Sequence, residues 1–271
     1  MVVQHNLSAM NTNRELSTVT SSLSKSTEKL SSGYRINRAA DDAAGLSISE
    51  KLRSQIRGLD KAASNSQDGI SLIQVAEGAL NETHSILQRM NELATQAAND
   101  TNVSADRTAI QAEMDQLTSE IDRIQSTTQF NTQNLLDGSF KNMKLQVGAQ
   151  SGQVITISIS KMDASSIGVG GLKVTDNSAA GNAMNKIQEA ITSVSTQRSS
   201  LGAIQNRLEH TINNLNTTSE NTSSAESRIR DTDMASEMVE YSKNNILQQA
   251  GQSMLAQANQ QTQGILSLLQ Q

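Results

Sequence analysis

Proline is absent from the 271 residues of this chain, and so is cysteine. A proline inside a helix removes a backbone hydrogen bond and clashes with the preceding turn, which costs about 3 kcal/mol or more. The absence of proline therefore favours long, unbroken helices and removes slow cis/trans isomerisation from folding. The absence of cysteine excludes disulfides and thiolate metal sites.

Aromatic residues are nearly absent as well, since the chain has no tryptophan, two tyrosines and two phenylalanines. Aromatic side chains contribute the largest buried area per residue, so no core of this chain can be built around them. Charged residues make up only 18% of the sequence. This composition favours long amphipathic helices packed in pairs over a compact globule.

The charge balance and the chain ends exclude further classes. The net charge is −5 and no tract rich in lysine or arginine occurs, which argues against a nucleic-acid partner. No stretch reaches the length of a transmembrane helix, so no membrane partner is expected. Residues 1–7 lack the basic and apolar regions of an ordinary signal peptide. From these features alone a cytoplasmic protein would be expected.

Apolar residues follow a heptad rhythm in three stretches. The stripes are Leu72, Ala76, Ala79, Thr83, Ile86, Met90, Leu93 and Ala97; Met184, Ile187, Ile191, Val194, Arg198, Leu201, Gln205, Leu208, Ile212 and Leu215; and Ile110, Met114, Leu117, Ile121 and Ile124. Sustained 3.5-residue periodicity is typical of helices that coil around one another. The sequence therefore predicts a mainly α fold of long antiparallel helical rods.

The pattern changes at about residues 140–180. Leu145 and Val147 alternate with polar residues, and Ile155, Ile157 and Ile159 do the same after a stretch that contains Gly148 and Gly152. Alternation on both sides of a glycine-containing turn predicts a β-hairpin. Residues 163–182 are small and glycine-rich, and we expect an irregular loop there with one short strand at most.

Both chain ends have sparse apolar positions at helical spacing. Ordering the backbone of residues 246–271 costs more than burial of their large aliphatic side chains returns. We therefore expect the ends to become ordered only when they join neighbouring copies. The predicted polymerisation seam comprises Leu7, Met10, Leu23, Leu247, Met254, Ile265 and Leu268, and the last four are expected to pack against the N-terminal helix.

Several long segments together resemble one family. They are residues 30–50 (LSSGYRINRAADDAAGLSISE), 65–80 (NSQDGISLIQVAEGAL), 201–208 (LGAIQNRL), 225–231 (AESRIRD) and 254–259 (MLAQAN). On these motifs the chain resembles the bacterial flagellins over residues 1–160 and 182–271. It departs from the common pattern at Tyr34, where leucine is more usual, at Val2, and at its non-basic end.

The resemblance implies a structural subunit that polymerises into the flagellar filament for motility and is not an enzyme. It implies an inner, lumen-side domain of residues 1–41 with 231–271 and an outer rod domain of residues 42–230. Only about 20 residues connect the hairpin to the returning helix, so the family's variable outer domains are expected to be missing. Members are exported unfolded through the flagellar channel, which implies a secreted, extracellular protein and replaces the cytoplasmic expectation.

The resemblance also implies partners. They are other copies of the chain, the export apparatus with a secretion chaperone, the filament cap and the hook-junction proteins, and a host Toll-like receptor that senses flagellin. The family's receptor motif, Gln-Arg-x-x-Glu-Leu, matches Gln88, Arg89, Glu92 and Leu93, with Gln96 one turn later and Glu113 on the following helix. Helical spacing predicts that Arg89, Leu93 and Gln96 share one exposed face.

Two alternatives remain at this level. A hook–filament junction protein shares flagellin-like ends, whereas an enzyme-bearing or adhesive flagellin requires an inserted domain. His5, His84 and His210 have no metal-ligand spacing, and no cofactor is expected. The pair Asp41–Asp42 is interpreted as helix caps and structural ion pairs near a helix start.

Overall fold

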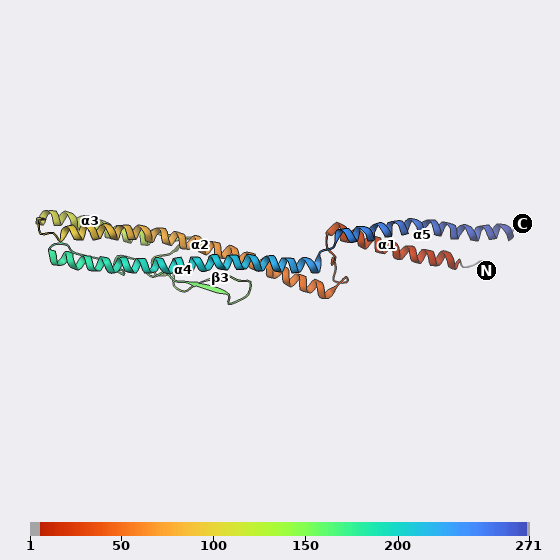
Figure 1. Cartoon of the computed structure of the whole chain (residues 1–271), viewed down its shortest axis with the longest axis horizontal. Helices are drawn as coiled ribbons and strands as arrows, with labels where there is room; N and C mark the ends of the chain where they lie inside the picture. The colour runs from red at the N-terminus through yellow and green to blue at the C-terminus, as the bar shows by residue number, and fades with distance from the viewer. Residues whose placement is uncertain (1–5, 270–271) are drawn as a thin grey trace. The chain divides into compact units, whose positions relative to one another are not determined.

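Long helices make up most of the chain. The computed structural model describes residues 6–269, and side chains over residues 6–261. The helices are α1 (Leu7–Ser32), α2 (Ala43–Ala97), α3 (Ser104–Thr127), α4 (Asn177–Arg230) and α5 (Met234–Leu269), as Figure 1 shows. Two small antiparallel sheets are formed by β1 (Gln129–Phe130) with β2 (Gln133–Asn134) and by β3 (Met143–Gln146) with β4 (Val154–Ile157). The predicted mainly α fold with a small β-hairpin region is confirmed.

The chain divides into two compact units. The first, called the terminal unit here, comprises Met1–Ser54 and Asn221–Gln271, and the second, the central unit, comprises Gln55–Glu220. Helices α2 and α4 each contribute residues to both units. The assignment of residues 1–41 with 231–271 and of 42–230 to inner and outer filament domains stays a prediction.

In the central unit, α2 and α4 run antiparallel. Ser219 donates a hydrogen bond to Asp60 at 2.9 Å near one end of the pair, and Thr95 donates to the sulfur of Met184 at 3.3 Å near the other. Rising numbers on α2 therefore meet falling numbers on α4. Helix α3 lies beside α2 (Figure 1).

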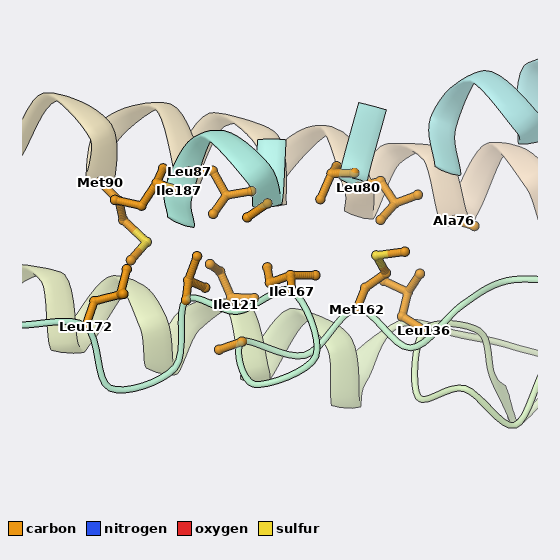
Figure 2. Packing of buried hydrophobic residues seen from close by; sticks show 14 of the residues in the cluster. Ala76, Leu80, Leu87, Met90, Ile121, Leu136, Met162, Ile167, Leu172 and Ile187 are labelled. Atoms are coloured by element: carbon orange, nitrogen blue, oxygen red, sulfur yellow. The ribbon is translucent and has the colours of Figure 1, made fainter. Parts of the chain in front are cut away.

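The core of the central unit lies between these helices and the segment that follows α3. Figure 2 shows Leu80, Leu87 and Met90 of α2, with Ile187 of α4, opposite Ile121 of α3 and side chains of the irregular segment. All five belong to one cluster of buried hydrophobic residues. Because the layer contains almost no aromatic side chain, its burial comes from many aliphatic contacts spread along the helices.

The heptad prediction is correct for one of the two positions in most repeats and wrong by one residue for the other. On α2 the buried stripe is Ile73, Ala76, Leu80, Thr83, Leu87, Met90, Leu93, Ala94 and Ala97, so the predicted Leu93 is buried. The predicted Leu72, Ala79 and Ile86 are only partly buried. On α4 the buried stripe is Ala180, Ala183, Ile187, Ala190, Val194, Gln197, Leu201, Leu208 and Leu215, so Met184 and Ile191 flank it and Arg198 and Gln205 fall outside it.

The shift arises because small residues occupy buried positions on α4. Ala183 and Ala190 are buried in the core, whereas the larger Met184 and Ile191 are partly buried and pack against it. The predicted stripe followed the larger side chains. On α3 the prediction is confirmed, since Ile110, Met114 and Ile121 are buried and Leu117 and Ile124 pack against the core.

The β3–β4 hairpin forms where the alternation predicts it. Leu145 lies opposite Ile155 in the antiparallel register, and Ile155, Ile157 and Ile159 are buried. The second hairpin, β1–β2, was not predicted. Its turn residues Asn131 and Thr132 have φ of 48° and 63°, a left-handed conformation that a β-branched threonine rarely adopts, so the sequence carries no usual turn signal.

The segment between β4 and α4 is more ordered than a loop prediction suggests. No strand forms between Ser158 and Asp176, all of which the structure describes. Even so, every second or third side chain is buried, as at Met162, Ile167 and Leu172 (Figure 2). This irregular segment covers the core of the central unit, and no extra domain is inserted between β4 and α4.

The corrected register makes a direct prediction. Leu80→Ala removes a fully buried side chain and is expected to destabilise the central unit by about 2–5 kcal/mol. Leu72→Ala, at a partly buried position of the same helix, is the matched control and is expected to cost about half as much or less. Urea denaturation followed by circular dichroism measures both, and equal losses would contradict the register.

Candidate assembly and recognition surfaces

The terminal unit contains an antiparallel pair of helices, α1 and α5, that lie side by side (Figure 1). Asn6 donates a side-chain hydrogen bond to the carbonyl of Ala258 at 2.9 Å, and Lys29 forms an ion pair with Glu237 at 3.3 Å. The two contacts lie near opposite ends of the pair. They fix the register in which the two ends of the chain meet.

Small and polar residues occupy the contact between these helices. On α5 the residues that face α1 recur every seven positions, at Glu237, Asn244, Gly251 and Ala258. Asn244 and, on α1, Ser26 are each only 4% exposed. A methyl group at Gly251 would lie 3.2 Å from Cδ1 of Leu16, so only glycine fits there without displacement. Leu16 and Leu23 of α1 and Leu255 of α5 are also partly buried.

Eight other large aliphatic side chains of the two helices are exposed. They form what we call the exposed apolar set: Leu7 and Met10 of α1 with Met234, Met238, Val239, Ile246, Leu247 and Met254 of α5. Sequence analysis placed Met254 and Leu247 in a seam against the N-terminal helix, but they are 59% and 44% exposed. That packing is wrong within the monomer, because Asn244, Gly251 and Ala258 hold the positions that face α1.

The other predicted seam residues differ in how exposed their side chains are. Leu23 is partly buried, in line with the α1 positions that face α5. Leu7 and Met10 are exposed. Ile265 and Leu268 lie outside the described side chains. Sequence reasoning missed Met234, Met238 and Val239. The small or polar residue at every seventh position of α5 indicates that the large apolar residues of this helix do not face α1.

Two carboxylates stabilise the turn between α1 and α2. Asp41 accepts hydrogen bonds from the backbone N–H groups of Arg38 and Asn37, at 3.0 and 3.2 Å, and these bonds lower its pKa. Asp42 accepts from the N–H of Gly45 at 2.8 Å at the start of α2. The predicted helix-capping role is therefore confirmed for Asp42, whereas Asp41 stabilises the turn that precedes it and Arg38 forms its ion pair with Glu28 at 3.0 Å.

Tyr34, which stands where leucine is more usual, makes a contact that a leucine could not make. The guanidinium carbon of Arg230 lies 4.5 Å from the centroid of the Tyr34 ring, a cation–π arrangement. The backbone of Tyr34 also bridges to Asp231, and Gly33 ends α1 with φ of 76°, a conformation that glycine adopts without strain. The tyrosine therefore ties the turn after α1 to the end of α4 within the terminal unit.

Helix α5 begins with a similar cap. Asp233 accepts from the hydroxyl of Ser236 at 3.0 Å and from the N–H of Ala235 at 2.9 Å. These bonds, together with the N–H of Ser236, lower the pKa of Asp233. A carboxylate at a helix N-terminus also interacts favourably with the helix dipole.

The second surface lies on α2 and α3 in the central unit. Arg89 forms ion pairs with Glu113 at 2.9 Å and with Glu92 at 3.1 Å, and its hydrogen bonds to Glu113 and Glu92 raise its pKa. Gln88 and Gln96 are exposed nearby in the sequence. We call Gln88, Arg89, Glu92, Gln96 and Glu113 the Arg89 surface. The prediction that Leu93 shares this face is wrong, because Leu93 is 2% exposed and lies in the core.

Among the residues that the structure describes, no group of three or more His, Asp or Glu side chains is placed to hold a metal ion. His84 contacts Gln88 at 3.1 Å through its ring nitrogen, His210 lies exposed on α4, and His5 lies outside the described residues. In the part of the chain that the structure describes, no helix is both long and apolar enough to span a bilayer. Fold and surfaces define a structural protein that acts through its surfaces.

Comparison with known proteins identifies which structural protein family this is. Residues 3–141 match the bacterial flagellin N-terminal helical region, and residues 184–269 match the bacterial flagellin C-terminal helical region. The chain is 58% identical to a flagellin of Halalkalibacterium halodurans and 51% identical to a flagellin of Bacillus subtilis, in each case over 99% of this chain and 100% of the relative. It is 49% identical, with the same coverage, to the flagellar filament 33 kDa core protein of Treponema phagedenis.

Solved structures agree with this result. The crystal structure of Bacillus cereus flagellin aligns with a TM-score of 0.50 and 34% identity, covering 56% of this chain and 88% of that one. A putative flagellar hook-associated protein of Vibrio parahaemolyticus aligns with a TM-score of 0.59 over 70% of this chain and all of the other. Its identity is 15%, so this likeness concerns the fold alone.

The chain belongs to the bacterial flagellins. It is a self-polymerising structural subunit of the extracellular flagellar filament, which serves motility, and it is not an enzyme.

The caps at Asp41 and Asp233 predict an acid-sensitive terminal unit. Because both pKa values lie below the ordinary value of 3.8, the stabilisation is complete above that pH and is lost as the pH falls below it. Asp41→Asn with Asp233→Asn keeps the acceptor oxygens and cannot titrate, so its Tm is expected to fall less steeply between about pH 4 and about pH 2. Thermal melts by circular dichroism test this, and equal slopes for variant and wild type would refute it.

Proposed function

We propose that the chain joins the filament through the exposed apolar set, which neighbouring copies bury. The observation that carries the proposal is the exposure of these eight aliphatic side chains on α1 and α5. Full burial of one such side chain contributes about 1.5–3 kcal/mol. The contact between α1 and α5 leaves these eight side chains exposed, so in this proposal their burial comes from other subunits.

A filament follows when unlike surfaces meet. If the exposed apolar set of one copy packs against a different surface of the next, the contact is heterologous and repeats without closing. Such a contact generates an open helical polymer. In this proposal residues 1–41 and 231–271 form the inner, lumen-side part and residues 42–230 form the outer rod.

The outer surface of the filament then consists of the rod itself. The segment between β4 and α4 has no inserted domain and packs its own side chains into the core. This supports a short flagellin whose helices and hairpins are exposed directly on the filament.

The proposed route to the filament is export as an unfolded chain. The export apparatus, with a secretion chaperone, delivers the chain through the hollow flagellum to the cap. The absence of proline and cysteine suits this route, because neither isomerisation nor disulfide formation delays refolding. The hook-junction proteins would contact the first subunits of the filament.

Sequence analysis left a hook–filament junction protein as the alternative; the full-length identity to flagellins opposes it, and the likeness to the hook-associated protein concerns the fold alone. Electron microscopy after salting-out distinguishes the two. Long filaments support the filament subunit, whereas a persistent monomer supports the junction protein.

A second proposed role is recognition of the monomer by the flagellin-sensing Toll-like receptor. The Arg89 surface supports it, since Arg89, Glu92 and Glu113 join two helices through exposed ion pairs. Arginine is frequent at binding hot spots because its planar group forms several hydrogen bonds at once. Leu93 supports the surface from the core and does not touch the receptor.

The first prediction from this proposal concerns Met254→Asp. On assembly the new carboxylate would be buried without a partner, at a cost of several kcal/mol. In the monomer Met254 is exposed, so helicity and Tm are expected to stay at wild-type values while filaments fail to form. Circular dichroism of the monomer and electron microscopy after salting-out measure the two effects.

The matched control is Met254→Leu, which keeps volume and apolarity and is expected to assemble. Normal filaments from the aspartate variant would show that Met254 is not buried between subunits.

The second prediction concerns Arg89→Ala and the receptor ectodomain. Loss of a hot-spot arginine is expected to weaken binding of the monomer about 30-fold or more. Lys243→Ala breaks another exposed ion pair, with Glu240 at 3.0 Å on α5, and is expected to leave affinity unchanged. Surface plasmon resonance measures both, and unchanged affinity for Arg89→Ala would exclude this surface.

A further inference from the structure

Methionine is unevenly distributed between buried and exposed positions. Met90, Met114 and Met162 are buried in the core of the central unit. In contrast, the terminal unit carries Met10, Met234, Met238 and Met254 at 47–62% exposure. All four belong to the exposed apolar set, so half of that set is methionine. Met143 of the central unit is also exposed, at 39%.

Exposed methionine differs chemically from the leucine, isoleucine and valine beside it. The sulfur lone pair attacks one oxygen of hydrogen peroxide, the O–O bond breaks, and the departing hydroxide takes a proton to leave as water. The thioether becomes a sulfoxide and loses two electrons, which the peroxide gains. The product is polar and disrupts methionine-rich interfaces, and sulfoxide reductases can reverse it.

We propose that Met10, Met234, Met238 and Met254 form an oxidation site that controls assembly. Peroxide converts these four side chains to sulfoxides in the free subunit, and the modified subunit no longer joins the filament. The proposal rests on the proposed burial of the exposed apolar set between subunits. It adds that oxidation of these methionines prevents assembly, which burial of the set between subunits does not by itself imply.

Oxidation is expected to prevent assembly without unfolding the monomer. The sulfoxides form on exposed helix surfaces, so the terminal helices keep their contact through Ser26, Asn244 and Gly251. Oxidation therefore leaves the monomer folded and acts only when a polar S=O group must be buried. Within a filament the same sulfurs are covered, so an assembled subunit resists the oxidant that disables a free one.

The experiment treats purified monomer and preformed filaments with the same dose of hydrogen peroxide. Peptide mass mapping is expected to find sulfoxides at the four sites and at Met143 in the monomer, ahead of Met90, Met114 and Met162. After salting-out, the critical concentration for assembly is expected to rise about tenfold or more, and a methionine sulfoxide reductase is expected to restore it. In filaments the four sites are expected to be protected. Normal assembly of fully oxidised monomer would overturn the proposal.

A set of variants assigns the effect to these residues. The variant with Met10→Leu, Met234→Leu, Met238→Leu and Met254→Leu keeps apolar volume and is expected to assemble equally well with or without peroxide. Met143→Leu is the matched control at an exposed site of the central unit, and it is expected to remain as sensitive as wild type. Sensitivity that persists in the fourfold variant would overturn the proposal.

A measurement without variants covers the case in which the fourfold variant fails to fold. Partly oxidised wild-type protein is polymerised, and the two fractions are mapped. Sulfoxides at the four sites are expected to be enriched in the unpolymerised fraction, and equal distribution would overturn the proposal. The outcome is separate from the proposed function: if Met254→Asp blocks assembly but oxidation does not, the assembly surface stands and the oxidation control fails.

Discussion

The contact between α1 and α5 constrains what the terminal unit can do. Asn244, Gly251 and Ala258 face α1 at every seventh position, and Ser26 faces α5. A buried asparagine in a helix pair fixes register at a cost in stability, and a glycine adds close approach but no burial. The pair is therefore specific in its register, and it leaves eight large aliphatic side chains uncovered.

From this constraint follows the placement of the large aliphatic residues. Since small and polar residues hold the contact positions, Leu247 and Met254 lie on the exposed part of α5. Ordering a residue costs about 1–2 kcal/mol of backbone entropy, which the α1–α5 contact offsets only in part. Burial against neighbouring copies supplies the rest, so in the proposed mechanism order and assembly of the ends are coupled.

The central unit, in contrast, buries its apolar side chains within the same chain. Its core is closed by the irregular segment after β4, through side chains such as Met162 and Ile167, and needs no second copy. A unit with its own core keeps its shape before assembly and presents fixed side chains such as Arg89 on its surface. This division lets one part of the chain provide a rigid body while the other responds to neighbours.

The sequence predicted the helices and the β3–β4 hairpin, because periodicity and residue types carry that information directly. It did not predict which face of each heptad is buried. Ala183 and Ala190 are buried ahead of Met184 and Ile191, and helix packing, which depends on both partners, decides between adjacent positions. The same ambiguity placed Met254 in the helix pair, whereas the surface placement of Leu93 came from the receptor motif and conflicted with the heptad stripe that contains it. For Met254, the polar residue at position 244 of the same heptad pattern carried the missing information.

Repetition along a polymer makes these small energies decisive. A single altered side chain in the exposed apolar set changes every subunit contact by the same amount, and about 1.4 kcal/mol per contact shifts the association constant of each addition tenfold. The stability of the monomer is expected to stay unchanged, because the side chain is already exposed there. In the proposed mechanism, changes at the exposed residues of α1 and α5 therefore act through assembly, whereas changes at Ser26, Asn244 and Gly251 act through the register of the helix pair. The two sets occupy different faces of the same helices, so the chain can adjust the strength of its filament contacts without changing how its own ends meet.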